Sequence, residues 1–156
     1  LYTNPTTNEI FRFWQHLANA GLIGGSYTGV TSNPTGYFFG VGPLNTPAGR
    51  IRNARWSVTY GNNLSGTFSS NWFTYEYTPY VFVYGAINGT SWNSSKVMSA
   101  DEAWNIDSKI DDGLPGLGKV LTTVGSNCNS AASQSDLTTT YSLTQAGINC
   151  TLLIRP

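Results

Sequence analysis

The sequence predicts a single α+β domain, residues 1–156, in which two helices pack against a mainly antiparallel sheet. Residues 6–21 and the segment that begins at Ser99 carry helix signals, whereas several other segments alternate apolar and polar residues or are apolar throughout. The predicted order is helix, long loop, three strands, helix and strand, followed by a C-terminal segment that a disulfide closes. This order favours an antiparallel sheet with segregated helices. A chain of 156 residues is long enough to bury its own core.

The composition excludes several classes of function. Charged residues make up 10% of the chain, and eight Lys and Arg balance eight Asp and Glu, whereas a typical soluble protein has about 25% charged residues. We therefore expect no nucleic-acid partner and no binding to anionic membranes. No apolar run approaches the roughly 20 residues of a membrane-spanning helix. A polar surface of Ser, Thr, Asn and Gly favours an extracytoplasmic protein.

The first predicted helix covers residues 6–21. Thr6 and Glu9 form a capping box at its start, and Gly21 is a favourable end. Apolar residues between them repeat at the helical period and make one stripe. We expect this stripe to hold the helix to the sheet through Ile10, Phe13, Trp14 and Leu17.

Predicted strands follow a loop at residues 21–52, which is dense in glycine and proline and holds one short aromatic strand at 37–41. Residues 55–60 alternate as a half-buried strand does, and residues 71–77 alternate similarly. The segment 80–87 is apolar on both faces, which is typical of a central strand.

The second predicted helix begins at Ser99, which forms a capping box with Glu102, and it ends at Gly113 and Pro115. Three more strands complete the prediction. They are residues 119–124, followed by 138–143 and 150–154 as a terminal pair.

Cys128 and Cys150 enclose 21 polar-rich residues near the C-terminus. In an oxidising compartment they would form a disulfide that stabilises the fold by about 3 kcal/mol. The alternative is two free thiols in a cytosolic protein. Two sulfur ligands and one histidine make a structural zinc site a poor explanation.

The stretch "NIDSKIDDGLPGLGKV", residues 105–120, is the main candidate for chemistry. A calcium loop of the D-x-[DN]-x-[DN]-G type is excluded, because Lys109 occupies a ligand position and no glutamate follows. A different oxygen cage for calcium could use Asp107, Asp111 and Asp112. In the alternative, Asp107 is solvated while Asp111 and Asp112 accept hydrogen bonds from backbone amides.

Catalytic motifs are not convincing. Adjacent aspartates rarely point into one cleft, so a glycosidase carboxylate pair is a weak hypothesis. The only histidine, His16, lies in the first helix without a serine motif. The segment 113–119 has glycines and a lysine, but no helix follows it to bind phosphate. We therefore expect no enzymatic activity and no cofactor other than calcium at the aspartates.

Aromatic residues allow a second hypothesis, a platform on which sugars stack. The alternative is that the same residues stabilise the sheet. Four Asn-X-Ser/Thr triplets would permit glycosylation in a suitable host. The aromatic candidates are Trp56, Trp72, Trp92, Tyr75, Tyr77 and Tyr80, and the triplets begin at Asn63, Asn88, Asn93 and Asn149.

Three segments resemble the soluble part of type IV pilin-like proteins, a group that includes minor pilins and the pseudopilins of type II secretion. These segments are "FRFWQHLANAGLIGGSYTG" (11–29), "WNIDSKIDDGLPGLGKV" (104–120) and "YSLTQAGINCTLLI" (141–154). The resemblance covers both ends and the middle of the chain in family order. The aromatic strands between them match only in general character.

The resemblance implies a pilin fold, with an N-terminal helix on an antiparallel sheet and a C-terminal segment closed by a disulfide, where Cys128 and Cys150 fit. It implies a structural subunit of a bacterial surface or periplasmic filament, with other subunits as partners. The family's apolar N-terminal segment, its contact with the membrane, is missing, so we expect Leu1 to follow a truncated or processed region. The family's calcium ligands cannot be matched here. The alternative function is a secreted carbohydrate-binding module.

Overall fold

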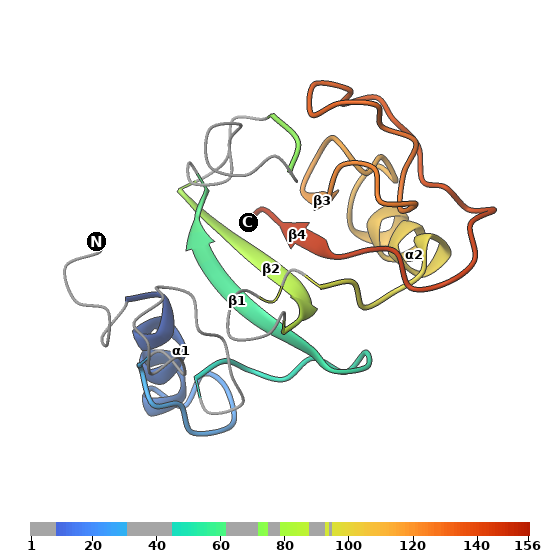
Figure 1. Ribbon diagram of the computed structural model, residues 1–156. Coiled ribbons are helices and arrows are strands. Elements are labelled where there is room, and N and C mark those ends of the chain that lie inside the picture. The colour runs from blue at the N-terminus through green and yellow to red at the C-terminus, as the bar shows by residue number, and fades with distance from the viewer. Residues whose placement is uncertain (1–8, 31–44, 62–71, 75–78, 88–92, 94) are drawn as a thin grey trace.

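The protein is described by a computed structural model, which places residues 9–30, 45–61, 72–74, 79–87, 93 and 95–156. Within these residues it is an α+β fold with two helices and an antiparallel sheet, as the sequence predicted, and the sheet has four strands. The helices are α1 (Glu9–Asn19) and α2 (Ala100–Ile110), and the strands are β1 (Ala54–Tyr60), β2 (Tyr80–Ala86), β3 (Val120–Thr122) and β4 (Leu152–Ile154). Figure 1 shows α1 near β1 and β2, and α2 at the other end of the molecule.

The sheet has the strand order β1-β2-β4-β3, so the C-terminal strand is inserted between two earlier ones. The prediction that residues 80–87 form a central strand is confirmed, because β2 pairs with β1 on one side and β4 on the other. The register places Tyr84 of β2 opposite Trp56 of β1 and Leu152 of β4. β4 then pairs with β3, where Val120 faces Ile154.

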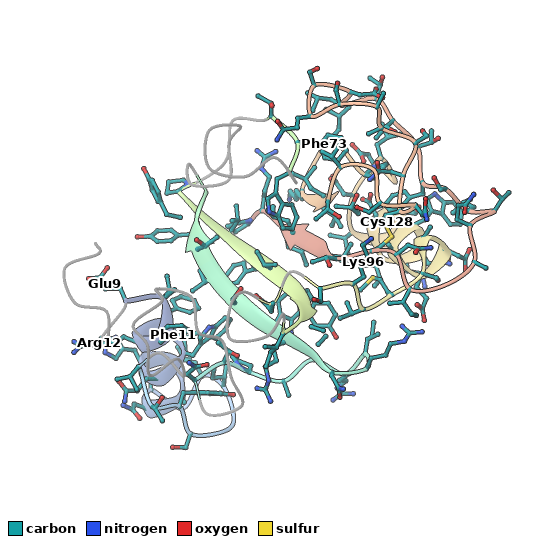
Figure 2. All side chains as sticks on the ribbon, in the orientation of Figure 1. Glu9, Phe11, Arg12, Phe73, Lys96 and Cys128 are labelled. Carbon is teal, nitrogen blue, oxygen red and sulfur yellow. A yellow bond between two sulfur atoms is a disulfide. The ribbon has the colours of Figure 1, made fainter. Side chains whose placement is uncertain are left out.

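Each face of the sheet buries its own apolar cluster. Val81, Val83, Leu121 and Leu153 point to one face and pack with Trp72. Tyr84, Val120 and Leu152 point to the other face, where they pack with the buried alanines of α2. Phe82 lies on this second face, because side chains alternate along a strand. Phe11 lies at the α1 end of the molecule, whereas Phe73 and Cys128 lie toward β3 and α2 (Figure 2).

The helix α1 packs on the sheet through aromatic side chains. The Phe13 ring centroid lies 6.0 Å from that of Phe82, and the Trp14 ring centroid lies 6.2 Å from it. Trp14 is buried, while Ile10, Phe13 and Leu17 are half-buried. Phe11, which the predicted stripe omitted, is only 1% exposed. The centre of the buried face is therefore rotated toward Phe11.

Gly21 ends the first helix as its sequence predicted. Its N–H donates to the Ala18 carbonyl, and the Leu22 N–H donates to the Leu17 carbonyl, each over 2.9 Å. These two bonds form a Schellman motif, in which the residue after the helix takes a left-handed conformation. Gly21 has a φ of 72°. The start predicted at Thr6 lies outside the described residues.

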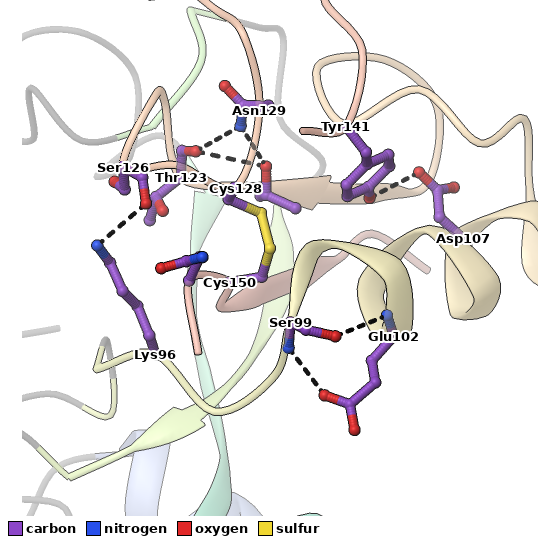
Figure 3. Close-up of a disulfide and its surroundings, with 12 residues drawn as sticks. Lys96, Ser99, Glu102, Asp107, Thr123, Ser126, Cys128, Asn129, Tyr141 and Cys150 are labelled. Carbon is purple, nitrogen blue, oxygen red and sulfur yellow. Dashed lines mark hydrogen bonds between the residues drawn. A yellow bond between two sulfur atoms is a disulfide. The ribbon is translucent and has the colours of Figure 1, made fainter. Parts of the chain in front are cut away.

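The second helix also begins as predicted. Its capping box consists of the Glu102 N–H donating to Ser99 Oγ over 3.1 Å and the Ser99 N–H donating to Glu102 Oε2 over 2.8 Å (Figure 3). Arg52 donates to the same carboxylate over 3.1 Å. The Ser99 backbone and Arg52 together lower the pKa of Glu102. This helix start is therefore joined to the segment that leads into β1.

The prediction of a terminal strand pair is wrong. Within residues 138–143, Tyr141 makes one isolated bridge with Asn129, and the rest form turns and coil. Residues 152–154 pair with β2 and β3 instead. Pairing with these strands, which are distant in sequence, buries Leu152 on one face of the sheet and Leu153 on the other.

Other predicted strand boundaries change less. The strand predicted at 119–124 is limited to Val120–Thr122, and Trp72 forms an isolated bridge with Thr123. Of the strand predicted at 71–77, only residues 72–74 are described. The strand predicted at 37–41 lies outside the described residues. The strand at 55–60 is not half-buried, because Ser57 and Thr59 on its polar face are also buried.

A disulfide joins Cys128 and Cys150, as predicted. Both cysteines are 0% exposed. The Cys150 N–H donates to the Met98 carbonyl, and the Cys150 carbonyl accepts from the Val97 N–H, at 2.9 and 2.8 Å. The bridge therefore fixes the segment between the cysteines to the chain just before α2 (Figure 3).

Replacing Gly21 tests the helix end. Gly21→Ala should lower the free energy of unfolding by about 1 kcal/mol, because alanine resists a left-handed φ. A Cβ at Gly21 would meet nothing within 4 Å, so the expected cost is conformational and not steric. Urea denaturation measures it.

Gly24→Ala is the matched control, because its Cβ also meets nothing within 4 Å and its φ is not positive. It should change the free energy of unfolding by less than about 0.5 kcal/mol. Equal effects of the two substitutions would contradict a Schellman end at Gly21.

Candidate functional site

The candidate site is the turn that follows α2. The helix places Asp107 in its last turn and Asp111 at its C-cap, where the Asp111 N–H donates to the Asp107 carbonyl over 2.6 Å. Gly113 then takes a left-handed φ of 75°, which turns the chain back along the helix. We call Asp107, Asp111 and Asp112 the aspartate cluster. Each can place one carboxylate oxygen within 4.8 Å of the others'.

Asp107 is the buried member of the cluster. It is 0% exposed, and its carboxylate accepts a hydrogen bond from Tyr141 Oη at 2.9 Å (Figure 3) and another from the Gly113 N–H at 3.3 Å. Burial, aided by the charges of Asp112 and Asp111, raises the pKa of Asp107 to about 6 against the lowering effect of these two donors. Asp107 is therefore not solvated, in contrast to the alternative considered from the sequence.

Asp111 and Asp112 accept backbone hydrogen bonds. Asp111 Oδ2 accepts from the Lys119 N–H, and Asp112 Oδ1 accepts from the Leu114 N–H at 2.8 Å. A Cβ at Gly118 would overlap the Asp111 carboxylate and lie 3.0 Å from Asp112 Oδ2. A glycine at this position, with its φ of 73°, therefore lets the turn close around the two carboxylates.

The cluster offers two kinds of chemistry. The backbone amides and the Tyr141 hydroxyl give every carboxylate a donor without a cation. Three carboxylate oxygens within reach of one another also suit a hard cation such as Ca²⁺, which takes six to eight oxygen ligands. Calcium binding by Asp107, Asp111 and Asp112 stays a prediction.

Tyr141 is the residue of this site that the sequence did not reveal. It lies 34 residues from Asp107, inside the disulfide-closed segment. Burial and the Asp107 carboxylate raise the pKa of Tyr141 above its usual range, so its hydroxyl keeps its proton and acts as the donor. Nothing in the sequence near Tyr141 indicates this contact, because its partner lies 34 residues away.

The aromatic residues predicted as a sugar platform do not form one surface in the described part of the chain. Trp72 is 3% exposed and belongs to a core cluster. Trp56 is half-buried, with its ring centroid 4.5 Å from that of Tyr84. Tyr80 is 64% exposed. The others, Tyr75, Tyr77 and Trp92, lie outside the described residues.

Asn93 belongs to the core and not to a glycosylation site. Its side chain is 0% exposed, and its amide donates to the carbonyls of Arg55 and Val83 at 2.6 and 2.9 Å. Its Oδ1 accepts from Ser57 Oγ at 2.5 Å. The bond to Asn93 gives the buried hydroxyl of Ser57, on the polar face of β1, a partner. Asn149 is half-buried, while Asn63 and Asn88 lie outside the described residues.

Comparisons with known proteins add no assignment. No family model, no curated protein and no solved structure matches this chain. The site is therefore interpreted from its own geometry.

The raised pKa of Asp107 predicts a pH-dependent stability. The folded protein binds this proton with a pKa of about 6, whereas the unfolded chain has an Asp pKa near 3.9. The contribution is complete below about pH 4 and is lost as the pH rises through 6, up to roughly 3 kcal/mol. Urea denaturation between pH 4 and 7 should show this decrease.

Asp107→Asn should flatten the decrease, because asparagine does not titrate. Tyr141→Phe should shift it to higher pH, since its hydroxyl hydrogen bond lowers the pKa of Asp107. Asp101→Asn, at an exposed carboxylate on the first turn of α2, is the control and should leave the decrease in place. An unchanged curve in Asp107→Asn would contradict the assignment.

The calcium prediction has a separate test. If the aspartate cluster binds calcium, the Tm should rise with calcium concentration and fall again with a chelator, since a ligand of the folded state stabilises it by mass action. Asp112→Asn should weaken this response and Asp101→Asn should not. A Tm of the wild type that does not change with calcium contradicts the prediction and leaves the amides as the partners.

Proposed function

We propose that this chain is the head domain of a structural subunit in a type IV pilus or pseudopilus-like filament. The observation that carries the proposal is the combination of an N-terminal aromatic helix on an antiparallel sheet with a C-terminal segment closed by a disulfide. The three segments that resemble the family form α1 and the turn after it, the last part of α2 with the aspartate turn, and the end of the disulfide-closed segment with β4. These parts of the fold would be the common framework.

In this role the domain is not an enzyme. Its partners are other filament subunits, and it has no nucleic-acid partner. Among the described residues, no helix is long and apolar enough to cross a membrane. Membrane contact in this proposal belongs to an apolar segment upstream of Leu1. The disulfide is compatible with an extracytoplasmic protein at the cell surface or in the periplasm of a bacterium.

The gene tests the proposal. We expect the codons before Leu1 to encode an apolar helix of about 20 residues, and we expect the protein with this segment to be recovered with sheared surface filaments or a pseudopilus. Deleting the apolar segment should leave the head domain soluble in the periplasm or medium. A linker or a second soluble domain upstream of Leu1 would contradict the proposal.

The alternative function, a secreted carbohydrate-binding module, is favoured by one observation. Tyr60 and Tyr80 are opposite each other at one end of the β1–β2 pair, and they are 39% and 64% exposed. Exposed tyrosine rings can stack on sugars. Screening the chain on a glycan array tests this function, with Tyr60→Ala and Tyr80→Ala as the variants that should lose binding.

A further inference from the structure

One of the tryptophans in the described residues lies at the surface. Trp104, in the middle of α2, is 38% exposed, whereas Trp14 and Trp72 are 6% and 3% exposed. Trp56 packs on Tyr84, with 4.5 Å between their ring centroids. Trp104 belongs to neither apolar cluster of the core. Core packing therefore does not account for the aromatic ring at this position.

The helix face around Trp104 is polar. Ser108 and Asp111 follow Trp104 at intervals of four and seven residues, so these three side chains lie on one face of α2. Asp101 precedes Trp104 by three residues on the same face, and its side chain is exposed. The indole is therefore flanked along the helix by a hydroxyl on one side and by carboxylates on both sides.

The turn after α2 leaves a space beside the indole. A Cβ at Gly113 would lie 2.9 Å from Ser108 Oγ, 3.4 Å from Trp104 Nε1 and 3.7 Å from Trp104 Cδ1. A side chain at this position would therefore fill the space between the hydroxyl and the N–H edge of the indole, which glycine leaves unfilled. Asp112, the preceding residue, is exposed. We call Trp104, Ser108 and Asp112, with the space at Gly113, the indole site.

The indole site offers hydrogen-bond donors as well as acceptors. Within the described part of the chain, neither the Trp104 N–H nor the Ser108 hydroxyl makes a hydrogen bond. Asp112 accepts one, from the Leu114 N–H to Oδ1 at 2.8 Å, whereas an ionised carboxylate can accept about four. A ligand that covers the indole face can therefore both donate hydrogen bonds to this site and accept them from it.

This combination selects the chemical class of the ligand. An organic cation would use the indole face and the carboxylates, but it would leave the indole N–H without an acceptor. An anion would accept from the indole N–H, but the charges of Asp101 and Asp112 would repel it. Sugar hydroxyls both donate and accept, and the C–H face of a pyranose ring is apolar and can lie on an aromatic ring. A neutral saccharide therefore matches every group of the site.

We propose that the indole site binds a neutral saccharide, with a pyranose ring on the face of Trp104. The sugar hydroxyls bond the Trp104 N–H, the Ser108 hydroxyl and the Asp112 carboxylate. This inference goes beyond the proposed filament function and does not depend on it. For the alternative function, a carbohydrate-binding module, it names a site on α2 that is distinct from the pair Tyr60 and Tyr80 of β1 and β2.

Nitrogen-15 NMR titration of the chain tests the site, with cellotetraose, chitotetraose and maltotetraose as probes and a chelator present so that calcium does not contribute. At least one saccharide should shift the signals of the Trp104 indole N–H and the Gly113 amide saturably. Trp104→Ala should weaken this binding about tenfold or more, because it removes both the ring and the donor. Trp104→Phe keeps a ring without the N–H, and Ser108→Ala removes the hydroxyl, so each should weaken it about two- to tenfold.

Tyr80→Ala is the control, because Tyr80 is 64% exposed and lies outside the indole site. It should leave the affinity for the saccharide unchanged, and the remaining amide signals of each variant report that the fold is intact. Three results would each overturn the indole site. They are the absence of saturable shifts with all three saccharides, saccharide binding of wild-type affinity in Trp104→Ala, and saturable shifts of the Trp104 indole signal with choline but with none of the saccharides.

The outcomes separate this site from the proposed functions. Loss of saccharide binding in Tyr80→Ala but not in Trp104→Ala would overturn the indole site and leave a carbohydrate-binding function with the tyrosine pair. The sequence upstream of Leu1, which tests the filament function, does not enter this titration. Either proposal can therefore fail while the other stands.

Discussion

The insertion of β4 between β2 and β3 is the constraint on which the fold depends. This three-residue strand provides Leu152 to the apolar cluster on one face of the sheet and Leu153 to the cluster on the other. Its partners lie about 70 and about 30 residues earlier in the chain, so its pairing must offset the entropy of closing long loops. The disulfide between Cys128 and Cys150, two residues before β4, shortens both of these loops.

Local signals in the sequence predicted local structure well. The capping box at Ser99, the glycine at the end of α1 and the apolar run of β2 each act over a few residues, so neighbouring side chains determine them. The fold class followed from the order of these elements, and the disulfide followed from the presence of two cysteines in the C-terminal segment. The predicted stripe of α1 omitted Phe11, because apolar residues lie on more than one side of this helix. Which side is buried is determined by contact with the rest of the protein.

Interactions between distant residues could not be read from the sequence. The segment 138–143 alternates as a strand does, but only Tyr141 makes a bridge, with Asn129, whereas β4 pairs with both β2 and β3. The hydrogen bond between Tyr141 and Asp107 likewise requires the disulfide-closed segment to lie against α2. The spacing of the aspartates in the sequence predicts the cluster, whereas the burial of Asp107 depends on the contact between α2 and the disulfide-closed segment.

The central place of β4 has a consequence for the order of folding. Because β4 follows β2 and β3 in the chain but lies between them in the sheet, β2 and β3 can be joined only after the chain has been made as far as Ile154. Until then, β1 and β2 can pair, but one edge of β2 stays open and neither apolar cluster is complete. A polypeptide with this topology completes its core only when β4 becomes available for pairing.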